Sequence, residues 1–272
     1  MADTAPDQTA ADRPMGILDD PNEDRALQVS LDGRVYARHP VRTHLVTASD
    51  DAPAVVARYA APLGDDVAFV AVSERMVAIT QGRSYPMTEI QPGWLARFLV
   101  RFVTRPGYGI GLGTPQTLQL AIDEVGAPRI LIAAAVSGIT KPFGVHGLFY
   151  RIAGPQAAAI DGPTSYTIAP YNQAATLGPS DPNGAAAGIA AAIGVPVAII
   201  DANDAGCNVL GASDGLDRRM VARLFADNPL GQAHEQTPVC VVRRVEWRDG
   251  QPLPPEPHSR LTAPGARRRP AG

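Results

Sequence analysis

The apolar residues of this chain fall into short runs separated by glycine, proline and aspartate. Runs that are rich in β-branched side chains and end at turn residues are typical of strands. Four runs have this pattern, at residues 67–72, 76–79, 195–200 and 239–245. A fifth run, at 129–136, is apolar at every position after Arg129, and such continuous apolarity predicts a buried strand.

Four other segments carry apolar residues at helical spacing. The clearest is 114–125, which begins with Thr114 as N-cap, has a proline at the first helical position and ends at Gly126. The others are 94–103, an alanine-rich segment at 184–193, and 216–225. Because helices and strands alternate along the chain, the sequence predicts a mixed α/β body.

The two ends of the chain differ in composition from the middle. Residues 1–24 contain seven acidic residues and one arginine, and residues 249–272 contain six prolines and the run Arg267-Arg268-Arg269. Segments with few large apolar side chains do not build a core. We therefore predict disordered tails at 1–30 and 249–272 and one domain over 31–248; the arginine run is typical of a solvated end.

Overall composition restricts the function. The chain has 272 residues, 45% of them hydrophobic and 19% charged, with a formal net charge of -3. This balance supports a sizeable core and gives no general electrostatic case for binding nucleic acid or a membrane. A cytoplasmic protein is expected, since the sequence shows no apolar run of membrane-spanning length and no signal peptide. Its two cysteines, Cys207 and Cys240, are expected to be inert apolar residues.

Polar residues follow the predicted strand at 195–200. Asp201, Asn203 and Asp204 supply hard oxygen atoms at the carboxyl end of that strand, where open α/β sheets bind ligands. Such oxygens suit Mg²⁺ or Mn²⁺. The alternative is a turn in which these side chains bond their own backbone.

A glycine-rich loop precedes the predicted helix at 114–125. Gly109, Gly111 and Gly113 allow the backbone to approach a ligand, and the helix start at Thr114 offers free N–H groups to a phosphate. The loop is neither a P-loop nor a dinucleotide fingerprint. A plain flexible connection is the competing interpretation.

Further candidates lie in the loops that follow. Lys141 and His146 sit in a glycine-rich stretch, where a cation can hold a phosphate or carboxylate and a histidine can carry a proton. Asp161 adds a carboxylate at a turn. A solvated lysine and a structural histidine are the competing interpretations.

Several of these segments resemble the coenzyme F420:glutamate ligase family. LGPSDPN at 177–183, an alanine-rich helix and then VPVAIIDANDAG resemble that family's LPEDPD, helix, strand and SDT-x-G succession. LGDDVAFVAV at 63–72 followed by QGR resembles its DGD strand and SKAEGR segment. The likeness spans roughly residues 40–245, and its central part, with KPFGVHGLFYRIAG and DNPLGQ, is similar to a divergent ligase-like branch.

The resemblance implies a mixed α/β ligase fold, a homodimer and an enzyme that uses GTP or ATP with Mg²⁺ or Mn²⁺. The family joins glutamate to a phosphorylated deazaflavin through an acyl phosphate. The resemblance also implies metal ligands among Asp161, Asp201, Asn203 and Asp204. The residue types described above assign catalytic roles to Lys141 and His146 and phosphate contacts to Gly109, Gly111, Gly113 and Thr114, and Arg83, the arginine of the segment that resembles SKAEGR, is expected to contact phosphate as well.

Three positions depart from the family pattern. Ala78 and Ile79 stand where the family has Ser-Lys, and Gln81 stands where it has Glu. The absence of this serine, lysine and glutamate favours a second hypothesis, that of a non-catalytic relative that binds a small ligand.

Overall fold

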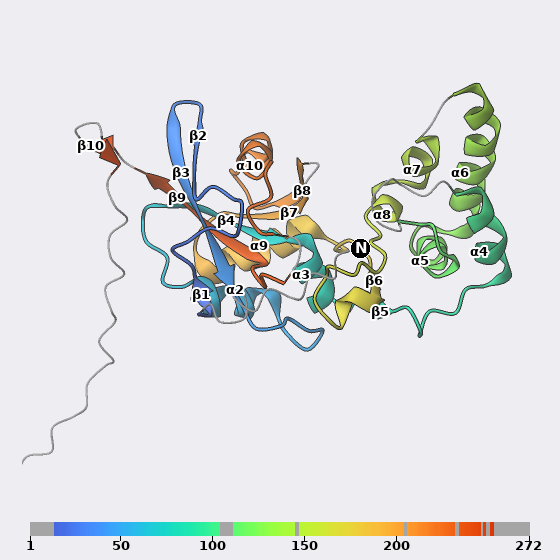
Figure 1. Cartoon of the computed structure of the whole chain (residues 1–272), viewed down its shortest axis with the longest axis horizontal. Helices are drawn as coiled ribbons and strands as arrows, with labels where there is room; N and C mark the ends of the chain where they lie inside the picture. The colour runs from blue at the N-terminus through green and yellow to red at the C-terminus, as the bar shows by residue number, and fades with distance from the viewer. Residues whose placement is uncertain are drawn as a thin grey trace, which may run out of the picture.

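The computed structural model of the chain describes residues 14–103, 111–144, 147–203, 206–231, 234–245, 247–248 and 251–252. Figure 1 shows two parts, a β-sheet flanked by helices and a group of helices formed by the middle of the chain. The two-stranded ribbon of β5 (Ser84–Pro86) and β6 (Ala174–Thr176) lies between them. The protein is thus a mixed α/β protein with a seven-stranded mixed sheet.

The large sheet has the strand order β1-β3-β9-β4-β7-β8, with β2 paired to β3. Its strands are β1 (Gly16–Ile17), β2 (Gln28–Leu31), β3 (Arg34–Arg42), β4 (Val67–Ser73), β7 (Val197–Asn203), β8 (Gly206–Ala212) and β9 (Val239–Val245). Within this sheet β4 and β7 are parallel, whereas β9 runs antiparallel to both β3 and β4. Consequently the carboxyl ends of β3, β4 and β7 all lie along the same end of the sheet.

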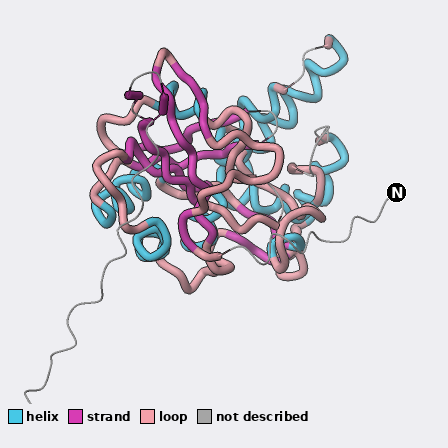
Figure 2. The backbone as a smooth tube through the Cα atoms, turned by 60° about the vertical axis from the view of Figure 1, so that its left-hand side comes forward, coloured by secondary structure: helices cyan, strands magenta, loops and turns pink. Residues whose placement is uncertain are grey.

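Helices cover both faces of this sheet, as the tube in Figure 2 also shows. Alternate strand residues face opposite sides, so Val70 and Val72 pack with α2 (Ala52–Ala60), α3 (Glu74–Thr80) and α9 (Pro182–Ile193). Phe69 and Ala71 pack instead with α10 (Arg218–Leu224).

The helical part has a core of its own, which contains Leu118, Ile130 and Phe149. Its elements are α4 (Trp94–Leu99), η1 (Val100–Phe102), α5 (Pro115–Val125), α6 (Ala127–Thr140), η2 (Lys141–Phe143), α7 (Leu148–Ala153) and α8 (Pro155–Ala158). The short segments η3 (Tyr171–Gln173), β10 (Trp247–Arg248) and β11 (Gln251–Pro252) complete the described chain. None of the described helices is long and apolar enough to cross a membrane.

Local sequence signals predict several elements correctly. The strands expected at 67–72, 195–200 and 239–245 are β4, β7 and β9, and the helices expected at 94–103, 184–193 and 216–225 are α4 with η1, α9 and α10. Helix α5 begins as predicted, because Thr114 and Thr117 cap each other reciprocally, and it ends at Gly126.

Two predicted strands are helices. Residues 76–79 belong to α3, and residues 129–136 belong to α6, whose 14 residues exceed the usual length of a strand. Gly126, at φ +87°, ends α5 and leads directly into α6, which has a proline in its first turn. An apolar run without polar interruptions does not distinguish a buried strand from a helix.

The domain also begins earlier than residue 31. Strands β1 and β2 pair with β3, and Leu18 is buried. The amide of Asn22 donates to the carbonyl of Pro229 and to Oγ1 of Thr237, both at 2.9 Å. Residues 14–30 therefore belong to the domain, while residues 1–13 and 253–272 lie outside the described residues.

Candidate functional site

The parallel strands β4 and β7 bring two carboxylates together. Their register ends with Ser73 beside Ile200, so Glu74, the first residue of α3, and Asp201 of β7 each directly follow the last paired position. Open α/β sheets bind ligands at this edge, outside the carboxyl ends of parallel strands.

A loop from the other part of the chain adds a third carboxylate. Asp161 follows α8 and is held by a pair of backbone hydrogen bonds with Thr176 of β6, both at 2.9 Å. Arg75 reaches it from the first turn of α3: Nη2 donates to Oδ2 of Asp161 at 2.5 Å, and Nη1 donates to Oγ1 of Thr167 at 2.9 Å. We call Glu74, Arg75, Asp161 and Asp201 the acidic edge.

The electrostatics of the acidic edge oppose full ionisation. Burial, followed by repulsion from Asp201 and Asp161, raises the pKa of Glu74 well above its usual range. Oε2 of Glu74 is buried and accepts no hydrogen bond. Burial and the charge of Asp161 also raise the pKa of Asp201, although a hydrogen bond from Asn203 at 3.4 Å opposes this. Three carboxylates facing one guanidinium leave an excess of negative charge that a cation would relieve.

The predicted metal ligands are thus partly brought together. Asp161 is near enough to Asp201 for its charge to raise the pKa of Asp201, and the amide of Asn203 donates to Asp201, whereas Asp204 lies outside the described residues. Within the described ranges, no three His, Cys, Asp or Glu side chains are arranged to hold a metal ion. The turn interpretation of Asp201 and Asn203 does not describe this structure, because both residues belong to β7.

Sequence reasoning missed Glu74 and Arg75. The signal was present, since both residues directly follow β4, the strand predicted at 67–72. Interpreting 76–79 as another strand concealed it, because Glu74 and Arg75 then occupied a short link between two strands. In the structure they form the first turn of a helix instead.

The glycine-rich loop is fixed at its described end. Leu112 is fully buried, Gly111 adopts a positive φ of 48°, and the Thr114 hydroxyl accepts the backbone N–H of Thr117 at 3.2 Å. Gly113 is buried beside it, and Gly109 lies outside the described residues. Part of the capping capacity at the start of α5 is therefore already used by its own threonines.

Arg83 has structural partners. Its Nη2 donates to Oε1 of Glu124 at 2.7 Å, and its Nε donates to the carbonyl of Gly178 at 2.7 Å. Both partners of the ion pair are mostly buried. Arg83 therefore joins α5 to the segment that precedes α9.

Lys141 lies on the helical part, at the exposed end of α6, whereas the acidic edge lies at the end of the large sheet. His146, its expected catalytic companion, lies outside the described residues.

The three positions that depart from the ligase pattern also have structural partners. Ala78 and Ile79 are buried in α3. Oε1 of Gln81 accepts hydrogen bonds from the backbone N–H of Ser180 at 2.9 Å and from its hydroxyl at 3.3 Å.

Both cysteines are free thiols. Cys240 is buried, and burial followed by the charge of Asp201 raises the pKa of Cys207 to about 12. Neither thiol is therefore expected to form a thiolate at neutral pH.

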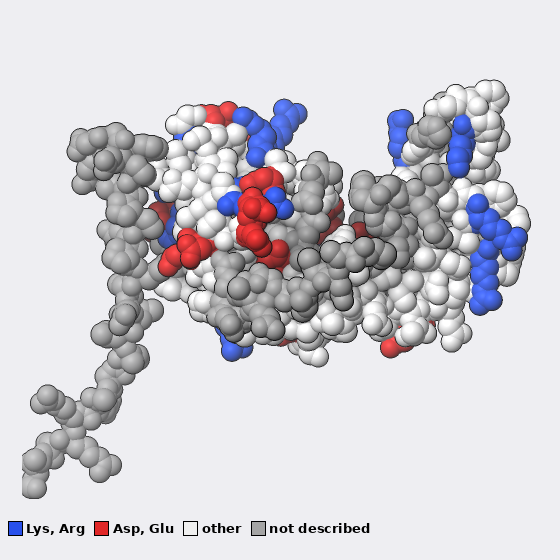
Figure 3. All heavy atoms as spheres, in the orientation of Figure 1, with Lys and Arg blue, Asp and Glu red and all other residues white. Residues whose placement is uncertain are grey.

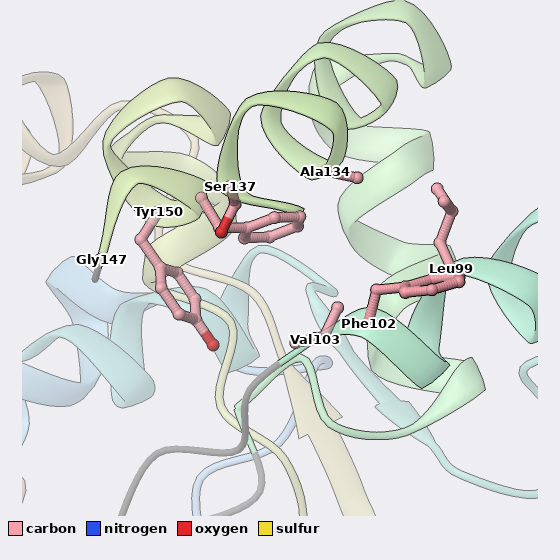
Figure 4. Close-up of a pocket in the computed structure, with 8 residues that line it drawn as sticks. Leu99, Phe102, Val103, Ala134, Ser137, Gly147 and Tyr150 are labelled. Atoms are coloured by element: carbon pink, nitrogen blue, oxygen red, sulfur yellow. The ribbon is translucent and has the colours of Figure 1, made fainter. Parts of the chain in front are cut away.

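A small cavity lies within the helical part, between η1, α6 and α7 (Figure 4). Its volume is about 60 Å³, and its lining is mostly apolar: Leu99, Phe102, Val103, Ala134, Ser137, Gly147, Phe149 and Tyr150. This volume is too small for a nucleotide or a deazaflavin, because ligand pockets usually measure about 300–1,000 Å³.

Comparison with known proteins does not assign a family. No protein-family model matches the chain, and no curated protein matches it significantly.

Proposed function

We propose that this protein is a metal- and nucleotide-dependent ligase that joins an amine to a phosphorylated small molecule. The resemblance points to glutamate as the amine and to a deazaflavin as an example of the small molecule. The observation that carries the proposal is the acidic edge. Its three carboxylates come from separate segments, influence one another electrostatically at the end of parallel strands, and share one arginine, which pairs with Asp161.

A divalent cation fits the chemistry of this edge. The donors are hard oxygens, their charges repel one another, and one buried oxygen of Glu74 has no hydrogen-bond donor. The side chains of the described residues do not complete a metal site by themselves. Mg²⁺ does not require that, since it usually takes one or two carboxylates together with substrate phosphates and waters.

In this proposal Asp161 and Asp201 hold the cation, with Asn203 orienting Asp201. A bound Mg²⁺ or Mn²⁺ would neutralise charge on the transferring phosphate. Arg75, already beside Asp161, would place a second positive charge near an acyl phosphate. Glu74, whose buried Oε2 accepts no hydrogen bond, would take the proton that the attacking amine must lose.

The nucleotide contacts of the proposal follow the resemblance. Gly111, Gly113 and the start of α5 would face a phosphate, and Lys141 would approach it from the end of α6. Because these residues belong to the helical part, the proposal requires the substrate to extend from the acidic edge toward those helices.

A non-catalytic relative that binds a phosphorylated ligand is the second candidate. It is favoured by Ala78 and Ile79, which are buried apolar residues at positions where the ligases have Ser-Lys. The ion pair of Arg83 with Glu124 favours it as well, because this guanidinium already has a carboxylate partner.

The test follows nucleotide turnover and conjugate formation together. The full-length protein is incubated with GTP or ATP, Mn²⁺, glutamate and a metabolite extract, and products are identified by mass spectrometry. The ligase proposal expects phosphate release that depends on both acceptor and amine. It also expects Asp161→Asn to lower the rate at least tenfold. Asp65→Asn is the matched control, because Asp65 is exposed at the opposite end of β4.

Binding of a phosphorylated ligand without turnover would replace the ligase by the second candidate. Unchanged turnover in Asp161→Asn would remove the acidic edge from the ligase mechanism.

A further inference from the structure

Helix α4 and the turn η1 expose three large aromatic side chains in a row. Trp94, Phe98 and Phe102 recur every four residues and are 79%, 49% and 60% exposed. Side chains four residues apart lie on one side of a helix, and the rings of Phe98 and Phe102 are in contact, with centroids 5.5 Å apart. The other side of the segment is buried, since Ala96 and Leu99 belong to the helical core.

Two exposed arginines lie beside these rings. Arg97 follows Trp94 by three residues, and Arg101 follows Phe98 by three, a spacing that makes side chains neighbours on a helix. Nε of Arg97 donates to the carbonyl of Pro92 at 3.0 Å, and neither guanidinium forms an ion pair within the described part of the chain. We call Trp94, Arg97, Phe98, Arg101 and Phe102 the α4 stripe.

The sequence around the α4 stripe carries no negative charge. No acidic residue occurs between Glu89 and Asp123. Figure 3 shows blue and white atoms over α4, whereas most of the red atoms on this side of the molecule lie over the sheet part. The chain as a whole has a formal net charge of -3, so the positive charge of this end is a local property that the overall composition conceals.

We infer that the α4 stripe docks on an anionic lipid surface. The inference does not rest on the proposed activity. Helices that lie in a membrane interface combine Trp or Phe on one side with arginine or lysine next to it. The rings enter the headgroup region, and a guanidinium forms paired hydrogen bonds with headgroup phosphates. The contact is peripheral, because the side of the segment that carries Ala96 and Leu99 stays packed in the helical core.

The charge of the α4 stripe fits this partner better than it fits a second copy of the chain. In a two-fold contact through the stripe the arginines of both copies meet, and the stripe offers no carboxylate to receive them. Single-stranded nucleic acids are bound in positively charged grooves, whereas the α4 stripe is the exposed side of a helix. An anionic bilayer is flat and presents negative charge along the whole length of such a helix.

Cosedimentation of the full-length protein with lipid vesicles tests the inference. Vesicles of phosphatidylcholine with about one third phosphatidylserine should bind the wild type about tenfold more tightly than phosphatidylcholine alone, and added salt should weaken this binding. The double variant Arg97→Gln, Arg101→Gln should lose the preference, whereas Arg97→Lys, Arg101→Lys should retain it because the charge remains. Arg34→Gln with Arg58→Gln is the matched control, since both arginines are exposed on the sheet part.

Tryptophan emission supplies a second measurement, which reports on the stripe itself. The chain has two tryptophans, so Trp247→Phe leaves Trp94 as the reporter. Its emission should shift to shorter wavelength when anionic vesicles are added, because an exposed indole leaves water for the lipid interface. Phe98→Ser should weaken vesicle binding several-fold. Tyr166→Ser should not, because Tyr166 is 49% exposed outside the α4 stripe.

Three results overturn the inference. They are equal binding to both kinds of vesicle, undiminished binding of the double glutamine variant, and an unshifted Trp94 emission in the presence of anionic vesicles. If these vesicles are not bound and the stripe variants instead weaken binding of a single-stranded oligonucleotide or dissociate a dimer, the stripe belongs to that other contact. Circular dichroism of each variant checks that it is folded.

Discussion

Arg75 and Asp161 form an ion pair across 86 residues of sequence, with Nη2 and Oδ2 separated by 2.5 Å. The pair ties the helix that follows β4 to the loop between α8 and the β5–β6 ribbon. It also supplies the positive charge of the acidic edge, beside three carboxylates.

Replacing this arginine should make the acidic edge more dependent on cations. In Arg75→Gln three carboxylates face one another without a guanidinium, so we expect a lower melting temperature at pH 7 without metal and a larger rise with Mn²⁺ than in the wild type. Differential scanning fluorimetry across a Mn²⁺ titration measures both effects. Arg58→Gln, on α2, is the control for loss of a charge, and an equal Mn²⁺ response in Arg75→Gln and wild type would contradict the prediction.

Removing the buried carboxylate should stabilise the metal-free protein. Because the folded-state pKa of Glu74 is raised, its ionisation favours unfolding, and this cost is incurred as pH rises through that pKa. Glu74→Gln should therefore raise the free energy of unfolding by about 1–3 kcal/mol at pH 7. The difference should vanish below about pH 4, where the carboxyl is protonated in both states.

Urea unfolding from pH 3 to pH 8 checks this dependence. Glu89→Gln, at an exposed position, serves as control. A stability gain that is the same at every pH would show that packing, and not charge, is responsible.

The contribution of the Asp227 carboxyl to stability should show the opposite pH dependence to that of Glu74. Burial alone would raise the pKa of Asp227, but hydrogen bonds from Arg38 and its charge lower it. The guanidinium of Arg38 is fully buried and also donates to the carbonyls of Leu224 and Ala26, both at 2.6 Å. Asp227→Asn should cost about 2–3 kcal/mol at pH 7, since a buried guanidinium loses a charged partner.

This cost should decline as pH falls through the lowered folded-state pKa of Asp227, since the wild type then loses the same charge. The same urea series measures it, with Asp32→Asn as control, because Asp32 pairs with Arg223 on the surface. A cost that persists undiminished at pH 2 would argue against charge as its origin.

The segment before β2 should contribute to stability through Asn22. Its amide links this segment to the turn before β9 by way of Pro229 and Thr237. Because these acceptors are buried, Asn22→Ala should lower the free energy of unfolding by about 1–3 kcal/mol. At this chain length that corresponds to a fall of roughly 2–4 °C in melting temperature per kcal/mol. Thermal unfolding followed by circular dichroism measures it, and Asn208→Ala at an exposed site is the comparison.

The amino-acid sequence by itself determined those elements whose signals are local. Thr114, Gly126 and the proline at position 115 specify the ends of α5 whatever surrounds them, because capping and φ are properties of a few adjacent residues. Strands β4, β7 and β9 were predictable because each is a short β-branched run with turn residues around it. Asp161 and Asp201 could be chosen as candidates, since a carboxylate after a buried strand or at a turn is visible in the sequence.

Tertiary structure alone decided the rest. Residues 129–136 form a helix because Gly126 and the following proline start one and the helical core accepts Ile130 and Ala133, although the apolar run itself fits either structure. Glu74 meets Asp201 because β4 and β7 pair in parallel with a particular register, and no local pattern encodes the register between strands so far apart in the chain. Burial among neighbours then sets the charge of Glu74, which is a property of the assembled edge and not of the residue.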